Sequence, residues 1–318
     1  GYLAGLRSGI IVAAEADPYA YDGPGDGDGW IILGDTVLTE DLTFSGDGVT
    51  IYNDDVTLDL NGHTITGPGL GVGIRILFRD GVTVKNGEVN GFEFGVYVEG
   101  SSNIMVEEVA LTGNRFGVFI WESSGVHVAD NEIEDNDVGV NSVRSSGMIE
   151  WNEVHSNRLH GVYLEESRFR VRCNTISDGQ FGIFIWSSRR VKVEGNELSG
   201  NSIGINVVGS SVLVRGNLLE GSLEFGLYME DSSGLVELNT IKNGERYGVY
   251  LLRSGINLRW NLIAENSVGV AIYSSNPTLR GNIIIFNSDF GVYCYDSEPR
   301  LMRNKIRYNG TDYYEEAP

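Results

Sequence analysis

The 318-residue sequence has little positive charge, little proline and no long apolar run. Its 23 Lys and Arg stand against 44 Asp and Glu, which gives a formal net charge of −21. Nucleic-acid binding and docking on an anionic membrane both need clustered cations, so this balance argues against each of them. Six prolines exclude collagen and a proline-rich linker. The absence of a run of about 18 apolar residues predicts no membrane-spanning helix and no direct membrane insertion.

Cysteine is also scarce, since Cys173 and Cys294 are the only two. The repeat described below places them several coils apart, and a disulfide requires Cα atoms within about 7 Å, so we predict two free thiols. Residues 1–29 are predicted to be an N-terminal extension or cap. Because Ala14–Ala16 has the small-x-small form of a signal-peptidase site, a cleaved leader is the alternative.

Glycine is abundant, with 43 residues, and much of it recurs at a fixed period. A marker Gly followed by an aliphatic residue returns every 21 or 22 residues, at Gly73, Gly95, Gly117, Gly139, Gly161, Gly182, Gly204, Gly226, Gly248, Gly269 and Gly291. A marker Asn keeps the same period, at Asn131, Asn152, Asn174, Asn196, Asn217, Asn239, Asn261, Asn282 and Asn304. Short alternating runs between the markers are typical of strands, and Ser, Gly and Asn clusters of turns. One repeat therefore predicts one coil of a parallel β-helix.

The fold class predicted from the repeat is all-β, a single-stranded parallel β-helix. It would have about 12 coils of 21–22 residues over residues 30–310, followed by a C-terminal tail at 311–318. Counting from each marker Gly, we expect positions −1, +1 and +3 to point inward and positions +2 and +4 outward. On this count His160, at position −1, is a core histidine. The marker Asn side chains are expected to stack in a ladder at a turn.

Positions +2 and +4 carry aromatic and acidic residues in a pattern that returns every three coils. Sugar rings present C–H faces that lie on aromatic rings, and carboxylates accept hydrogen bonds from hydroxyl groups. We therefore expect a glycan to bind along this face, at Tyr97, Glu99, Phe119, Trp121, Tyr163, Glu165, Phe184, Trp186, Tyr228 and Glu230. The alternative is that aromatic residues occupy these positions because they favour strands and stack on one another.

A second outward row lies two residues before each marker Asn, and its charge largely alternates in sign: Glu150, Arg172, Glu194, Arg215, Glu237, Arg259 and Arg280. Opposite charges on neighbouring strands attract, so the row favours solubility and correct register. With Arg168, Arg170 and Lys192 nearby, the same strip is locally basic. Contact with an acidic polysaccharide is the alternative interpretation.

The segment Val56–Gly67, VTLDLNGHTITG, and the Asn- and Gly-rich coils after it resemble the NosD-like proteins. These belong to the carbohydrate-binding and sugar-hydrolysis group of right-handed parallel β-helices. The resemblance covers about residues 30–310 and implies an extracytoplasmic rod that often handles glycans. NosD is associated with copper delivery, which needs clustered soft or imidazole ligands. The four histidines, His63, His127, His155 and His160, are dispersed along the chain, which argues against copper.

No catalytic set known from this fold is complete in the sequence. Asn53–Asp55 and Arg190–Lys192 match two fragments of the polygalacturonase pattern, but they lie about six coils apart and Gly62–Thr64 departs from a third. Asp17–Tyr19 departs from the Asp-Pro-His element of alginate epimerases. Glu165 and Glu166 form a carboxylate pair, although adjacent strand residues usually point to opposite faces. The sequence thus favours a protein that is not an enzyme.

The leading hypothesis is a secreted or cell-surface β-helix, such as an adhesin, that binds polysaccharide without catalysis; a periplasmic location is the alternative. A polysaccharide lyase, hydrolase or epimerase using the same groove is a second hypothesis. A stalk, sheath or surface-layer subunit is a third, because the open ends of a solenoid invite end-to-end self-assembly. No cofactor is expected, with calcium at the acidic segment 22–29 as the one alternative.

Overall fold

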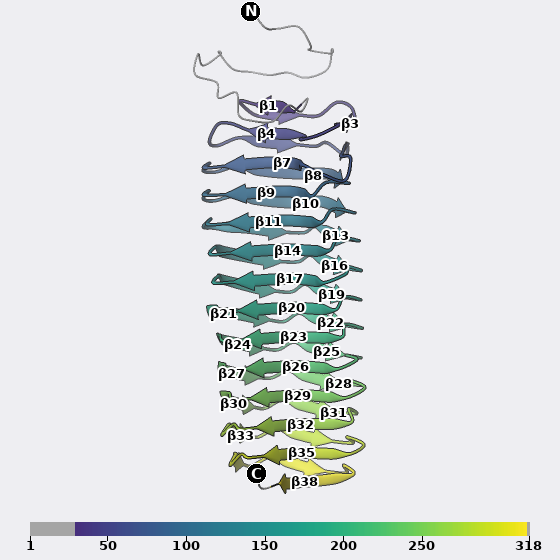
Figure 1. Ribbon diagram of the computed structural model, residues 1–318, viewed down its shortest axis with the longest axis vertical. Helices are drawn as coiled ribbons and strands as arrows, with labels where there is room; N and C mark the ends of the chain where they lie inside the picture. Colours follow the sequence, from purple (N-terminus) through teal and green to yellow (C-terminus); the bar gives the residue numbers. More distant parts are fainter. Residues whose placement is uncertain (1–28, 317–318) are drawn as a thin grey trace, which may run out of the picture. The chain divides into compact units, whose positions relative to one another are not determined.

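The computed structural model describes residues 29–316 (Figure 1). The signal-peptidase-like Ala14–Ala16 and nearly all of the acidic segment 22–29 therefore lie outside the described residues. The chain divides into two compact units, residues 1–148 and 149–318, and each is described by itself. The described residues form strands, turns and bends, and among them no helix is long and apolar enough to cross a membrane.

In the first unit, every strand that contains or aligns with a marker Gly joins one parallel sheet, which we call the marker sheet. Its strands follow one another in chain order as β1 (Trp30–Ile32), β4 (Val49–Ile51), β7 (Val72–Leu77), β9 (Phe94–Glu99), β11 (Phe116–Trp121) and β14 (Val138–Val143). The remaining strands form the second sheet: β2 (Thr36–Val37), β3 (Leu42–Thr43), β5 (Thr57–Asp59), β6 (Thr64–Thr66), β8 (Thr83–Asn90), β10 (Met105–Thr112), β12 (Val126–Ala129) and β13 (Glu132–Glu134). Strand β15 (Ser146–Glu150) contains the boundary between the units.

The second unit repeats this arrangement, with marker-sheet strands in chain order (Figure 1). They are β17 (His160–Glu165), β20 (Phe181–Trp186), β23 (Ile203–Val208), β26 (Phe225–Glu230), β29 (Tyr247–Leu252), β32 (Val268–Tyr273), β35 (Phe290–Tyr295) and β38 (Thr311–Glu316). Two further series form the second sheet. One contains β18 (Arg168–Arg172), β21 (Arg189–Glu194), β24 (Ser211–Arg215), β27 (Ser233–Glu237), β30 (Gly255–Arg259), β33 (Thr278–Arg280) and β36 (Arg300–Met302). The other contains β16 (Glu153–His155), β19 (Thr175–Ser177), β22 (Glu197–Ser199), β25 (Leu218–Glu220), β28 (Thr240–Lys242), β31 (Leu262–Ala264), β34 (Ile283–Ile285) and β37 (Lys305–Arg307).

The predicted right-handed parallel β-helix is confirmed, with differences at its ends. Among the described residues, the first unit has six marker-sheet strands and the second has eight, where we predicted about 12 coils, because the first coils depart from the 21–22-residue spacing and the last strand lacks a marker Gly. The tail expected from residue 311 is instead β38, which pairs in parallel with β35 up to residue 316. Both cysteines are free thiols, as predicted.

Positions +1 and +3 form the core beneath the marker sheet, as predicted. Val96 and Val98 on β9 are fully buried and align with Val118 and Ile120 on β11. Such stacking in register lets every coil cover the apolar side chains of the next, which is how a solenoid stabilises repeats that have no core of their own.

Position −1 does not point inward, so that prediction was wrong. The ring of Phe94 lies 5.2 Å from the ring of Tyr97, which is on the outer face. The marker glycine between them interrupts the strand alternation, and it is left out of the register that pairs Phe94 with Phe116. Only glycine fits there, because a Cβ on Gly95 would lie 2.6 Å from the carbonyl oxygen of Gly117. Positions −1 and +2 therefore share the outside of the sheet.

The marker Asn ladder is present and buried, as predicted. Asn196 is 1% exposed. Its Oδ1 accepts a hydrogen bond from the Asn174 backbone N–H at 3.0 Å, and its Nδ2 donates to the Val171 carbonyl at 2.9 Å and to Asn217 Oδ1 at 3.0 Å. A serine ladder that we did not predict supports another turn, where the Ser188 backbone N–H donates to Ser210 Oγ at 2.9 Å.

Candidate functional site

The outward face of β9 and β11 brings together the four residues predicted in the first unit. The rings of Tyr97 and Phe119 stack with centroids 5.5 Å apart, and those of Phe119 and Trp121 lie 6.2 Å apart. The Tyr97 hydroxyl donates to Glu99 Oε2 at 2.9 Å. Burial of the phenol, followed by this hydrogen bond, raises the pKa of Tyr97 to about 12. The hydroxyl therefore stays protonated and holds the carboxylate in one orientation.

A guanidinium covers the indole in this first set. Arg144 lies 4.5 Å above the centroid of Trp121, which is a cation–π contact. An ion pair of 2.8 Å with Glu122 holds Arg144 in that place. The face of Trp121 beneath the guanidinium is therefore not free to receive a sugar ring.

The outward face of β17 and β20 holds the second set, in the second unit. The Tyr163 hydroxyl donates to Glu165 Oε2 at 3.0 Å, and Glu165 lies beside Trp186 in the strand register. Burial and this hydrogen bond raise the pKa of Tyr163. The rings of Tyr163 and Phe184 lie 5.5 Å apart. The sequence predicted all four residues, and the structure places them together.

Trp186 differs from Trp121 because no guanidinium of the described residues stacks on its indole. Its side chain is 46% exposed. Val208 is its partner on the next strand, as Val143 is the partner of Trp121. The residue that follows Val208 is Gly209, whereas Arg144 follows Val143. Among the described residues, no cation stacks on Trp186, so an apolar ring face is open to solvent beside a carboxylate.

His160 lies in this outward stack rather than in the core where we predicted it. Its ring stacks on Phe181 at 5.1 Å and on Phe184 at 5.5 Å. Its Nδ1 is buried without a hydrogen-bond partner. Burial lowers the pKa of His160 to about 4, so the ring is neutral near pH 7. The contacts are those of an aromatic packing residue and not those of a metal ligand.

A buried amide interrupts the aromatic stack next to Trp186. Asn206 pairs in register with Phe184 on one side and Tyr228 on the other, and it is 8% exposed. Its Oδ1 has no hydrogen-bond partner. Asn141, at the same position of the three-coil pattern in the first unit, also has a buried Oδ1 without a partner. Such acceptors are rare in folded proteins, because an unpaired buried polar group costs about 1–3 kcal/mol.

The third predicted set, Tyr228 and Glu230, makes more polar contacts within the protein than the second set does. The Tyr228 hydroxyl donates to Glu230 Oε2 at 2.9 Å. Arg253 also contacts the Glu230 carboxylate, and its Nε lies 2.8 Å from Asp231. This carboxylate is therefore neutralised within the protein, whereas among residues 29–316 the Glu165 carboxylate accepts a side-chain hydrogen bond from Tyr163 alone.

Sequence reasoning missed an extension of the aromatic stack toward the last coil. Tyr250 stacks on Tyr228 at 5.5 Å and on Tyr273 at 5.0 Å, and Tyr293 stacks on Tyr314 at 5.7 Å. Position +2 is Tyr in most of these coils, which was the available signal, but the partner at position +4 no longer fits the three-coil pattern.

The comparisons with known proteins agree with this architecture. The family model of the periplasmic copper-binding protein NosD matches residues 40–212, 165–270 and 236–316. The chain belongs to the NosD family. This confirms the resemblance predicted from Val56–Gly67 and the coils after it. No curated protein matches the chain.

Solved structures similar to this NosD-family chain are also β-helices. The A-module of the mannuronan C-5 epimerase AlgE6 from Azotobacter vinelandii is 15% identical, with 92% of each chain covered and a TM-score of 0.62. A double mutant of the periplasmic alginate epimerase AlgG is 15% identical, with 89% of this chain and 73% of that chain covered and a TM-score of 0.50. At this identity the likeness establishes the fold alone.

The family name raises the question of copper, and the ligands within each unit do not fit it. Copper sites need clustered imidazole, thiolate or thioether groups. Within either unit taken alone, the described residues contain no three His, Cys, Asp or Glu side chains with ligand atoms within 4.8 Å of one another. Cys294 is buried in the core, where burial raises the pKa of its thiol to about 11, and His63 is paired with Asp41 at 3.1 Å.

Proposed function

We propose that this protein is an extracytoplasmic β-helix that binds a polysaccharide on the outward face of β17 and β20 without catalysis. The observation that carries the proposal is the open indole of Trp186 beside the oriented carboxylate of Glu165. A sugar ring would lay its C–H face on the indole, and Glu165 would accept hydrogen bonds from its hydroxyl groups.

The geometry of a parallel stack supports a chain ligand over a single sugar. Neighbouring strands lie about 4.8 Å apart, which is close to the rise of one pyranose in an extended glycan. The periplasmic location in the name of the NosD family and the alginate-related names of the similar structures support an extracytoplasmic glycan ligand.

The test compares two tryptophans at equivalent positions of the three-coil pattern. Binding of alginate oligosaccharides and of neutral β-linked oligosaccharides is measured by calorimetry on the wild type, Trp186→Ala and Trp121→Ala. We expect Trp186→Ala to weaken binding of its ligand about tenfold, or ~1.4 kcal/mol. Trp121→Ala should change it less than about threefold, because Arg144 already covers that ring. Equal losses in both variants, or none in either, would remove this site assignment.

A separate measurement tests the absence of catalysis. The protein is incubated with alginate and with neutral polysaccharides, and products are followed by proton NMR and by reducing-end formation. We expect no change in uronate composition and no new chain ends. Conversion that disappears in a Glu165→Gln variant would instead identify this face as the catalytic groove of an epimerase, lyase or hydrolase.

A further inference from the structure

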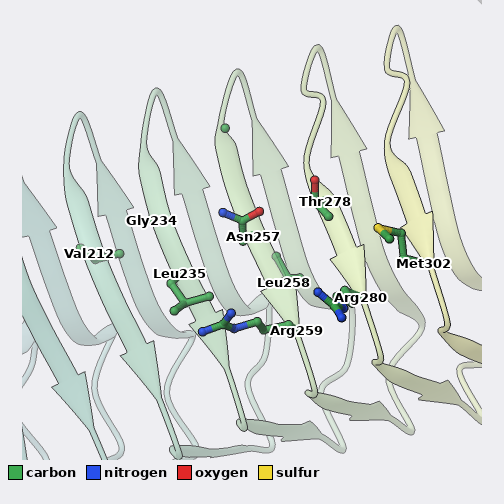
Figure 2. Close-up of a pocket in the computed structure, with 10 residues that line it drawn as sticks. Val212, Gly234, Leu235, Asn257, Leu258, Arg259, Thr278, Arg280 and Met302 are labelled. Carbon is green, nitrogen blue, oxygen red and sulfur yellow. The ribbon is translucent and has the colours of Figure 1, made fainter.

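A concave site lies on a different sheet of the second unit from the aromatic face. A groove of about 620 Å³ runs over β24, β27, β30, β33 and β36, all of which belong to the second sheet (Figure 2). Asn257 and Thr278 lie along one side of it, and Arg259 and Arg280 along the other (Figure 2). None of these residues belongs to the aromatic face described above.

Glycines and short side chains produce the hollow. Gly234 and Gly255 lie in the groove, where neither presents a side chain. Gly234 has φ +147°, and a Cβ there would lie 2.0 Å from the Val212 carbonyl oxygen, so a larger residue does not fit. Leu235 and Met302 bound the groove with apolar atoms. The base of the groove therefore has room for a flat ligand that carries both polar and apolar groups.

The charge row changes its pattern in this groove. Arg172 is paired with Glu150, and Glu237 is paired with both Arg215, at 3.6 Å, and Arg259, at 2.7 Å. The next two positions break the alternation, because Arg259 aligns with Arg280 and Arg280 aligns with Met302. No carboxylate among the described residues forms an ion pair with Arg280, which is exposed.

Two guanidinium groups on adjacent strands repel each other unless an anion lies between them. A third cation is close, because the exposed Arg300 aligns with Thr278 on the neighbouring strand. In a chain of net charge −21, this local excess of positive charge beside a groove is complementary to an acidic ligand. Nucleic acid is disfavoured, since the acidic remainder of the chain repels phosphate backbones.

We infer that this groove binds an acidic polysaccharide through the carboxylate of a uronate residue. Arg280 donates two parallel hydrogen bonds to the carboxylate, which is the geometry a guanidinium favours. Asn257 and Thr278 exchange hydrogen bonds with the sugar hydroxyls. Leu235 and Met302 contact the C–H face of the ring. The site is separate from the aromatic face and does not depend on the function proposed for it.

The test uses the full chain in a Trp186→Ala background, which isolates the groove from the aromatic face. Calorimetric titration with an oligouronate, a neutral oligosaccharide of equal length and a sulfated oligosaccharide is compared for Arg280→Gln, Arg280→Lys and the control Arg190→Gln. Arg190 is an exposed arginine on β21, outside the groove. We expect Arg280→Gln to weaken oligouronate binding at least tenfold, Arg280→Lys to weaken it less, and Arg190→Gln to leave it within twofold.

The outcomes separate the two proposals. Unchanged oligouronate affinity in Arg280→Gln, or an equal loss in Arg190→Gln, would overturn the groove site and leave the Trp186 face untouched. Equal or tighter binding of the sulfated probe would overturn the uronate assignment. Loss of neutral-sugar binding in Trp186→Ala with oligouronate binding intact would support two independent sites.

Discussion

The buried amide ladder makes a quantitative prediction at Asn196. An Asn196→Ala variant removes the acceptor of the Asn174 backbone N–H and the donor to the Val171 carbonyl. The position is 1% exposed, so water does not replace either partner. Each buried backbone group left unpaired costs about 1–3 kcal/mol, and we expect a loss of about 4 kcal/mol in the free energy of unfolding.

Asn304 provides the matched control, because at the last position of the ladder it makes the same two bonds to backbone groups. Its Oδ1 accepts from the Asn282 backbone N–H at 3.0 Å, and its Nδ2 donates to the Leu279 carbonyl at 2.8 Å. The side chain is half-buried, so water replaces it in part and Asn304→Ala should cost only about 1 kcal/mol.

Urea unfolding followed by circular dichroism gives the two losses. Amide hydrogen exchange then shows whether the effect is centred on the coils that adjoin Asn196, as nearest-neighbour stabilisation in a solenoid requires. Equal losses in the free energy of unfolding of the two variants would refute the reasoning, because the burial of the Asn side chain would then have no effect on its contribution to stability.

Two further substitutions test the outer face and its glycine. As pH falls from about 6.5 to about 4, the unfolded chain protonates His160 while the folded chain does not, so stability is full above this window and is lost within it. Allowing for solvent screening of a half-buried ring, we expect a loss of about 1–2 kcal/mol that His160→Phe removes, measured as urea midpoints at pH 7 and 4.5. Gly182→Ala should destabilise by about 3 kcal/mol or more in the same assay, because its Cβ would lie 2.6 Å from the Gly204 carbonyl oxygen; a neutral result would contradict the close approach of the two strands.

The coil architecture was predictable because the marker Gly and the marker Asn recur with the same period. The marker Gly lies in a strand and the marker Asn lies at a turn, so the two give independent evidence for the repeat. Outward positions +2 and +4 followed from the strict alternation of a strand after its marker Gly. Position −1, including His160, was mispredicted because the marker Gly itself breaks that alternation, and this depends on a backbone contact with the next coil that no single repeat reveals.

The two tryptophans show a further limit of sequence reasoning. Trp121 and Trp186 are equivalent in the repeat, yet Arg144 covers only the first. The difference was present in the sequence as Arg144 against Gly209, but its meaning required the register that places the start of the next turn above the indole. The groove at Arg280 could not be predicted from the sequence for a similar reason, because its depth depends on the backbone conformation at Gly234.

The amide ladder also constrains how such a chain can change in length. Asn196 bonds two backbone groups of the coil before it and also donates to Asn217 in the coil after it, so an added or deleted segment must restore partners on both sides. Insertions that fit this rule come in whole turns of 21 or 22 residues, whereas a shorter one must bulge out at a bend. Aromatic residues on the outer face can therefore be separated during evolution only by whole coils, in steps of about 4.8 Å. This step limits the spacings at which such proteins can bind a ligand.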